Sequence, residues 1–125
     1  IQAAIAREQL KKLPGFIFRR AEIFKKYQSA GLPLIDNTDK DIKPVRFRAV
    51  LLSDAKNIIS CQENLLAKGI KSIIPVREEE LLMPSMSVPN AAKLTHKTLS
   101  IPIYPSLSDN DVDRVIDVCT KVLKP

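Results

Sequence analysis

Residue types that most often carry chemistry are few in this sequence. The cysteines are Cys61 and Cys119, which are far apart and share no CxxC spacing, and His96 is the single histidine. Zinc sites usually combine several Cys or His ligands, and a thiol nucleophile needs a histidine base. We therefore expect two reduced, half-buried core thiols, and the sequence favours neither a disulfide, a metal site nor a thiol protease.

Acidic residues and glycines also give no catalytic pattern. The run Glu78–Glu80 predicts a solvated turn, and the other carboxylates show no spacing that would fix a catalytic distance. With three glycines in 125 residues, the chain has no glycine-rich loop that could cradle a phosphate. Residue chemistry alone therefore predicts no catalytic residue and no metal ligand.

Positive charge is concentrated near the N-terminus. The net charge is +6, and residues 1–30 hold seven Lys or Arg against two Glu. A basic helix could bind nucleic acid through Lys11, Lys12, Arg19 and Arg20, with an affinity that falls steeply with salt. It could also be the solvated face of a helix whose other side is packed. Because the chain lacks recognised nucleic-acid-binding motifs, we favour the solvated face and expect no nucleic-acid partner.

Length and composition indicate one globular domain with an appendage. The chain has 125 residues, of which 45% are apolar and 27% charged. Its apolar runs are too short to predict a membrane-spanning helix, so we expect no membrane partner. The first residues lack the apolar stretch of a secretory signal, and we therefore expect a cytoplasmic protein.

An amphipathic helix is predicted near the N-terminus, because apolar residues recur there at steps of three or four. Pro14 and Gly15 predict a kink or a very short interruption, since the stripe continues in phase beyond them. The stripe is larger than the domain alone needs, so we expect part of it to pack on something outside this chain. Its residues are Leu10, Leu13, Ile17, Ala21, Phe24 and Tyr27.

The whole pattern predicts an α+β fold: a small open β-sheet covered by helices on one side, with a long N-terminal helix. We expect a helix and loop in residues 1–43 and a small domain in residues 44–125. The predicted strands span residues 44–52, 70–76 and 98–105, and the predicted helices after the loop span residues 54–69, 91–97 and 108–123.

Capping residues mark the ends of two predicted helices. Ser108 and Asp111 have the spacing of a capping box at the start of the last helix. Asp54 or Ser53 can cap the earlier helix, and Gly69 would end it in the left-handed conformation. These signals predict where the helices begin and end more sharply than periodicity does.

Three stretches in this order resemble one protein family: IQAAIAREQLKKL with RRAEIFKKYQSA, then LLAKGIKS, then PNAAKLTHKTLSIPIYPSLSDNDVDRVIDV. The last is the most specific, because LSIPIYPSLSD is similar to a family pattern LSLPIYPSLTD. Over nearly its whole length, the chain resembles the C-terminal part of the DegT/DnrJ/EryC1/StrS aminotransferases. These are fold type I enzymes that use pyridoxal phosphate (PLP) to aminate keto-sugars attached to nucleotides.

The resemblance implies a small C-terminal domain, a linking helix at residues 1–43 and a homodimer. The lysine that binds PLP, the aspartate on its pyridine nitrogen and most phosphate ligands belong to the large domain of such enzymes. No catalytic or cofactor-binding residue is therefore carried over, and we expect this chain to hold no PLP and to be inactive alone. The alternative is a stand-alone, non-catalytic binding or regulatory α+β module.

One departure from the family pattern lies near the substrate side. Family members commonly show aromatic-x-Pro-Leu-His, whereas this chain has PVREEELL at residues 75–82, and the histidine expected near Glu80 or Leu81 is replaced. The resemblance leaves two substrate-binding candidates. Arg77 could contact a phosphate or carboxylate or be solvated, and Tyr104 could line the domain interface or be purely structural.

Overall fold

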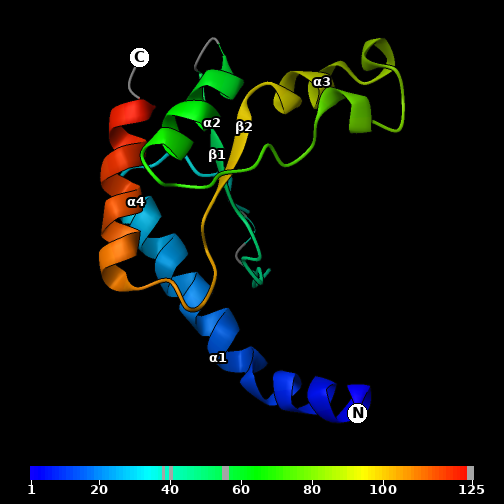
Figure 1. Cartoon of the computed structure of the whole chain (residues 1–125). Coiled ribbons are helices and arrows are strands. Elements are labelled where there is room, and N and C mark those ends of the chain that lie inside the picture. Colours follow the sequence, from blue (N-terminus) through cyan, green and yellow to red (C-terminus); the bar gives the residue numbers. More distant parts are fainter. Residues whose placement is uncertain (38, 40, 55–56, 124–125) are drawn as a thin grey trace.

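The computed structural model describes residues 1–37, 39, 41–54 and 57–123. Over these residues the chain is α+β, as predicted, with a long N-terminal helix and a small antiparallel sheet (Figure 1). The elements, in order, are α1 (Gln2–Ser29), β1 (Ala49–Leu52), α2 (Ile58–Ala67), η1 (Glu78–Glu80), η2 (Ser85–Ser87), α3 (Pro89–Thr95), β2 (Thr98–Ile101) and α4 (Asp109–Val122).

The sheet pairs β1 with β2, so that Ala49 lies opposite Ile101 and Leu52 opposite Thr98. Single bridges extend it on both sides, from Leu34 to Leu51 and from Ile73 to Ser100. The predicted strand at residues 70–76 is wrong, because only Ile73 pairs. Its backbone N–H and C=O both bond Ser100, at 3.0 and 2.7 Å, and Pro75, two residues later, has no N–H to continue the ladder.

The strand predicted from residue 44 begins only at Ala49. Arg46 has a φ of 57°, in the left-handed region, which breaks an extended run. Its guanidinium forms an ion pair with Asp36 and lies 3.8 Å from the centre of the Phe24 ring. These tertiary contacts hold Arg46 in a conformation that alternation along the sequence could not reveal.

Helix α1 is continuous through Pro14, so the interruption is a kink. Pro14 cannot donate a hydrogen bond to the preceding turn, and the dark-blue N-terminal turns run at an angle to the rest of the helix (Figure 1). Its last turns enter the core through Ile23, Phe24 and Tyr27, whereas residues 2–15 are all exposed. The division between residues 43 and 44 stays a prediction.

The core lies on one face of the sheet, where α2 and α4 pack against each other and α1 packs against α4. Leu51 and Leu99 are fully buried on this face. Both cysteines are free thiols that are more deeply buried than predicted, and burial raises the pKa of Cys119 to about 12. The buried residues of α1, α2 and α4 are Ile23, Phe24, Tyr27, Ile58, Cys61, Leu65, Val112, Val115 and Cys119.

The cap of the last helix is confirmed, because the Ser108 hydroxyl accepts from the Asp111 N–H at 3.1 Å. Gly69 follows α2 with a φ of 78°, as expected of a left-handed stop. The prediction of Ser53 or Asp54 as the cap of α2 is wrong. Asn57 caps that helix, and its side-chain oxygen accepts from the N–H groups of residues 59 and 60.

Candidate functional site

The two substrate-binding candidates line different hollows of the described surface. Tyr104 borders a groove at the Ile73 edge of the sheet, which we call the edge groove. Arg77 borders a second hollow, between α2 and the arm formed by residues 77–97, which we call the arm groove. The structure therefore does not bring Arg77 and Tyr104 together in one pocket.

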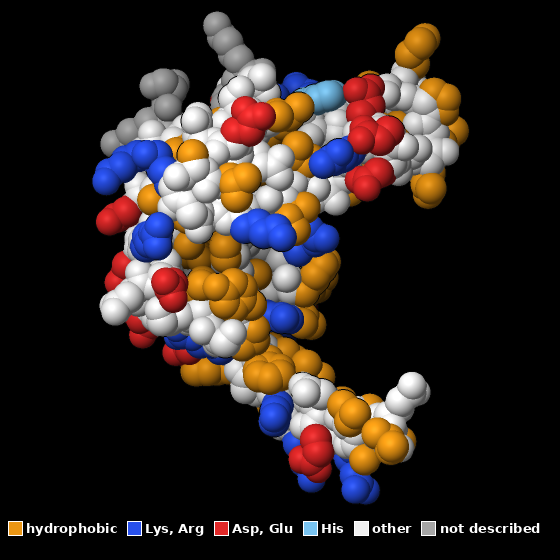
Figure 2. Space-filling model, viewed as in Figure 1, with side chains coloured by type: hydrophobic (Ala, Val, Ile, Leu, Met, Phe, Trp, Pro, Cys, Tyr) orange, Lys and Arg blue, Asp and Glu red, His pale blue; other side chains and the backbone are white. Residues whose placement is uncertain are grey.

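The edge groove has a volume of about 510 Å³ and lies where the 69–73 segment, the end of β2 and α4 meet. Its floor is apolar, because Ile70, Ile101, Leu107 and Val115 are all buried. Figure 2 shows a group of apolar side chains beside α4, with Lys and Arg side chains on both sides of them. The polar residues that line the groove are Lys71, Tyr104, Asp111 and Arg114, with Ser100.

Arg114 is held in this groove by the end of α2. Its Nη2 donates to the Lys68 carbonyl at 2.9 Å, which satisfies one of the free carbonyls at that helix end. A Cβ at Gly69 would lie 2.9 Å from the same Nη2. Gly69 is favoured by its positive φ, and any Cβ at this position would also displace the guanidinium from its place.

The arm groove, of about 360 Å³, holds the chain's histidine beside a glutamate. His96 Nε2 lies 3.1 Å from one carboxylate oxygen of Glu78, and the Ser85 hydroxyl donates to the other at 2.5 Å. These hydrogen bonds, first from Ser85 and then from His96, hold the pKa of Glu78 below its usual value. Because Ser85 bonds the carboxylate and not the imidazole, the three groups do not form a nucleophile–base pair.

Arg77 lies at the mouth of the arm groove and is exposed. Its guanidinium pairs with Glu79, with 3.7 Å between Nη1 and Oε1. An exposed pair at this distance contributes little to stability, so the guanidinium can turn to a ligand at small cost. Glu78–Glu80 is an exposed 3₁₀ turn, as the sequence predicted.

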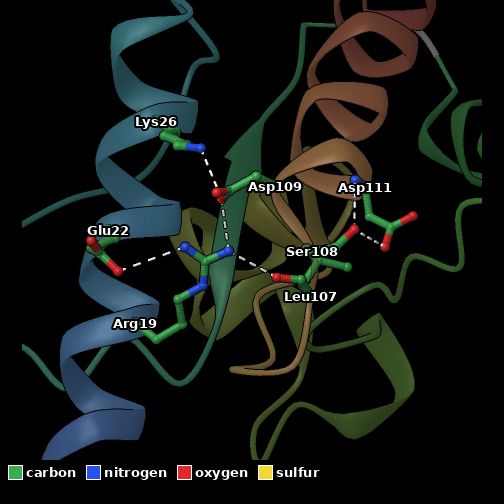
Figure 3. Close-up of polar contacts among 7 residues, drawn as sticks. All are labelled: Arg19, Glu22, Lys26, Leu107, Ser108, Asp109 and Asp111. Carbon is green, nitrogen blue, oxygen red and sulfur yellow. Dashed lines mark hydrogen bonds and ion pairs between the residues drawn. The ribbon is translucent and has the colours of Figure 1, made fainter.

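A third cluster joins α1 to α4, and the sequence analysis missed it (Figure 3). Asp109 Oδ1 accepts from Lys26 Nζ at 2.8 Å and from Arg19 Nη2 at 2.9 Å. Arg19 also donates to the Leu107 carbonyl at 2.9 Å and pairs with Glu22 at 3.6 Å. The two cations lower the pKa of Asp109 to about 2. We call this cluster the Asp109 clamp.

The Asp109 clamp occupies part of the basic face that could have bound nucleic acid. Arg19 and Lys26 are two turns apart on α1, so both reach the first turn of α4. Their charges are therefore used within the domain, and Arg19, one of the four residues considered for nucleic acid, is bound to Asp109. The signal in the sequence was the aspartate in the first turn of α4, which attracts cations from a neighbouring helix.

The described residues do not form a complete PLP site. A Schiff-base lysine needs an enclosed amine beside the cofactor ring. Among the described lysines all are exposed except Lys97, which is half-buried and bonds Asp54 at 3.0 Å. The described part also contains no group of three Cys, His, Asp or Glu suited to a metal, and none of its helices could cross a membrane.

Comparison with protein families gives a match over almost the whole chain. The sequence profile of the DegT/DnrJ/EryC1/StrS aminotransferase family matches residues 1–120. The chain therefore belongs to this family, as its last stretch had suggested. Enzymes of the family are PLP-dependent aminotransferases.

Relatives are matched over only part of their length. The spore coat polysaccharide biosynthesis protein SpsC of Bacillus subtilis is 28% identical, over 99% of this chain and 36% of SpsC. The dTDP-4-dehydro-2,3,6-trideoxy-D-glucose 4-aminotransferase of Saccharopolyspora spinosa is 30% identical, over 98% of this chain and 34% of the enzyme. The crystal structure of the aminotransferase TlmJ from Streptoalloteichus hindustanus matches 97% of this chain and 35% of its own, with a TM-score of 0.87 and 25% identity. The chain thus spans about a third of the length of its curated relatives.

Proposed function

We propose, from its membership in the DegT/DnrJ/EryC1/StrS family, that this chain is the small C-terminal domain, with its linking helix, of a PLP-dependent nucleotide-sugar aminotransferase-like protein. It would act with a cofactor-binding domain and would be inactive without it. The observation that carries the proposal is the exposed apolar side of α1. Leu10 and Phe18 are each 67% exposed, and Ile5 is 58% exposed.

An apolar helix face of this size calls for a partner, because isolated apolar patches on soluble domains are normally small. The N-terminal turns of α1 and the arm project on the same side of the core, with a concave face between them (Figure 2). We place the cofactor-binding domain on this concave face. α1 would then link the two domains and bury its apolar stripe between them.

Arg77 and Tyr104 would meet the substrate from this small domain. Arg77 presents an exposed guanidinium with only a weak internal partner, which suits a phosphate or carboxylate of a nucleotide sugar. Tyr104 is 51% exposed and would line the domain interface.

The proposal includes a homodimer and a cytoplasmic location. The rival function, a non-catalytic binding module, would leave α1 covered by self-association.

The test is the coding sequence around this chain, together with an assay of the protein that it encodes. The proposal expects a reading frame that also encodes a domain with a Schiff-base lysine. It further expects transamination of a nucleotide-linked keto-sugar by the whole polypeptide and none by the 125-residue chain. A reading frame limited to this chain, or transamination by this chain alone, would contradict it. An inactive whole polypeptide that holds such a lysine would restrict the role to binding.

A further inference from the structure

The edge groove combines features that the fold itself does not need. Its volume of about 510 Å³ lies within the range of small-molecule sites. The Tyr104 ring stands half-exposed at its wall, and its hydroxyl has no hydrogen-bond partner among the described residues. Ile73, also 51% exposed, flanks the groove from the edge of the sheet. An aromatic ring and an aliphatic side chain on an apolar floor could pack against a flat apolar body, such as an aromatic ring, in a ligand.

Two cations line the groove without a carboxylate partner in the described part of the chain. Among the described residues, Lys71 is exposed and forms no ion pair, and Arg114 bonds only the neutral Lys68 carbonyl. The single carboxylate in the lining is Asp111, whose Oδ2 accepts from the Ser108 hydroxyl at 2.5 Å. The lining therefore carries a net positive charge at neutral pH.

The cations at the edge groove differ from those of the Asp109 clamp in their surroundings. In the clamp, Arg19 and Lys26 both reach Asp109 within 2.9 Å. At the edge groove the cations instead face a hollow. Arg114 is also fixed in place by the carbonyl of residue 68, so its remaining N–H groups are pre-oriented for an acceptor.

We infer that the edge groove binds an organic anion with a flat apolar body, that is, a phosphate or carboxylate joined to an aromatic ring. The ring lies on the apolar floor against Tyr104, and the anionic group lies between Lys71 and Arg114. This inference rests on the proposed function in one respect only, because both have Tyr104 contact a ligand. It goes beyond that function in naming Lys71 and Arg114 and the chemistry that they recognise.

The test is a titration of the ¹⁵N-labelled 125-residue chain, followed by two-dimensional NMR. The probes are phenyl phosphate, benzoate, inorganic phosphate and neutral phenol. We expect phenyl phosphate or benzoate to shift the amides of residues 69–73 and 104 in a saturable way, with a dissociation constant on the order of 1 mM. Inorganic phosphate and phenol should bind at least about fivefold more weakly, because each supplies only half of the recognised group.

Variants separate binding from folding. Lys71→Gln removes a charge that forms no ion pair or hydrogen bond with the described residues. The fold should therefore be retained while phenyl phosphate binds about fivefold more weakly. Lys93→Gln is the matched control, because Lys93 is exposed on α3, outside the groove, and should leave binding unchanged. Arg114→Lys should also weaken binding, because it loses the planar fork.

Three results would overturn the inference. The first is that neither aromatic anion causes a saturable shift up to about 10 mM. The second is that phenol binds as tightly as phenyl phosphate. The third is that the Lys71 and Lys93 variants change the affinity for phenyl phosphate equally. If benzoate alone binds, the ligand is a carboxylate, and if phenyl phosphate alone binds, it is a phosphate. The titration needs no cofactor domain, so its failure is distinct from a failure of the whole polypeptide to transaminate.

Discussion

The two halves of α1 carry the same kind of apolar stripe but differ completely in burial. In the C-terminal half, Ile23 and Tyr27 are fully buried against the sheet and α4. In the N-terminal half, Leu10 is 67% exposed and Leu13 is 40% exposed. Amphipathic periodicity thus specifies which side of a helix can be buried, whereas the neighbouring elements decide whether it is buried.

Polar contacts differ between the two halves in the same way. Arg19 and Lys26 in the C-terminal half bond Asp109 on α4, so this half is fixed to the domain by side chains far apart in sequence. In the N-terminal half, the side-chain hydrogen bond is local, from Lys11 Nζ to the Glu8 carboxylate at 2.7 Å. We therefore expect mutations in the two halves to have very different effects on this chain and similar effects on a whole two-domain protein.

The largest difference should come from core truncation. Ile23→Ala should lower the free energy of unfolding of this chain by about 2–5 kcal/mol, because it leaves a cavity among buried neighbours. Leu10→Ala, the matched control in the other half, should change it by no more than about 0.5 kcal/mol. Urea unfolding followed by circular dichroism measures both. Equal losses would mean that the N-terminal half is also packed.

A smaller effect is expected for the Tyr27 hydroxyl, which donates to the Pro102 carbonyl at 2.8 Å. Tyr27→Phe keeps the buried ring and removes this bond, so the free energy of unfolding should fall by about 0.5–1.5 kcal/mol. The same urea assay applies. Tyr104→Phe is the control, since the Tyr104 hydroxyl has no hydrogen-bond partner among the described residues and stability should not change. If Tyr27→Phe leaves the free energy of unfolding unchanged, this hydrogen bond does not help to hold α1 to the segment that follows β2.

The smallest effect should come from the Asp109 clamp, because its carboxylate is exposed to solvent. The pKa of Asp109 is lowered from about 4 to about 2 in the folded state. Its contribution to stability is therefore fully present above pH about 4 and is lost as the pH falls through about 2. Asp109→Asn should destabilise the chain at pH 6, and the difference from the unmodified chain should shrink as the pH falls toward 2 and disappear below it.

The matched control for the clamp is Asp117→Asn, because Asp117 is exposed on α4 and forms no ion pair with the described residues. Its effect should be small and should not follow the same pH course. Added salt should also reduce the Asp109→Asn effect, because exposed ion pairs are screened. A destabilisation by Asp109→Asn that persists unchanged at pH 2 would contradict the role given to its charge.

Local signals predicted the helices well. The Ser108–Asp111 cap and the stripe from Leu10 to Tyr27 both depend on spacing within a few turns, and the structure has them. The strands were predicted less well, because pairing depends on distant residues. Ile73 is the only residue of the predicted strand at 70–76 that pairs with a neighbouring strand among the described residues. Arg46 leaves the extended conformation and contacts Asp36 and Phe24.

The candidate site shows the same limit. The sequence could single out Tyr104 through a family pattern, but the cations that share its groove could not be found by spacing. Lys71 and Arg114 lie in different elements and meet only because α4 packs against α2. The glycine before Ile70 was the one available signal, since Gly69 makes room for the Arg114 guanidinium.

The central claim is that the N-terminal half of α1 is a docking face for a domain outside this chain. Hydrogen–deuterium exchange of the α1 amides, measured in this chain alone and in the whole polypeptide, tests it most directly. We predict fast exchange of residues 2–15 in this chain, slow exchange in the whole polypeptide, and slow exchange of residues 23–27 in both. Equal protection of residues 2–15 in the two samples would contradict the claim.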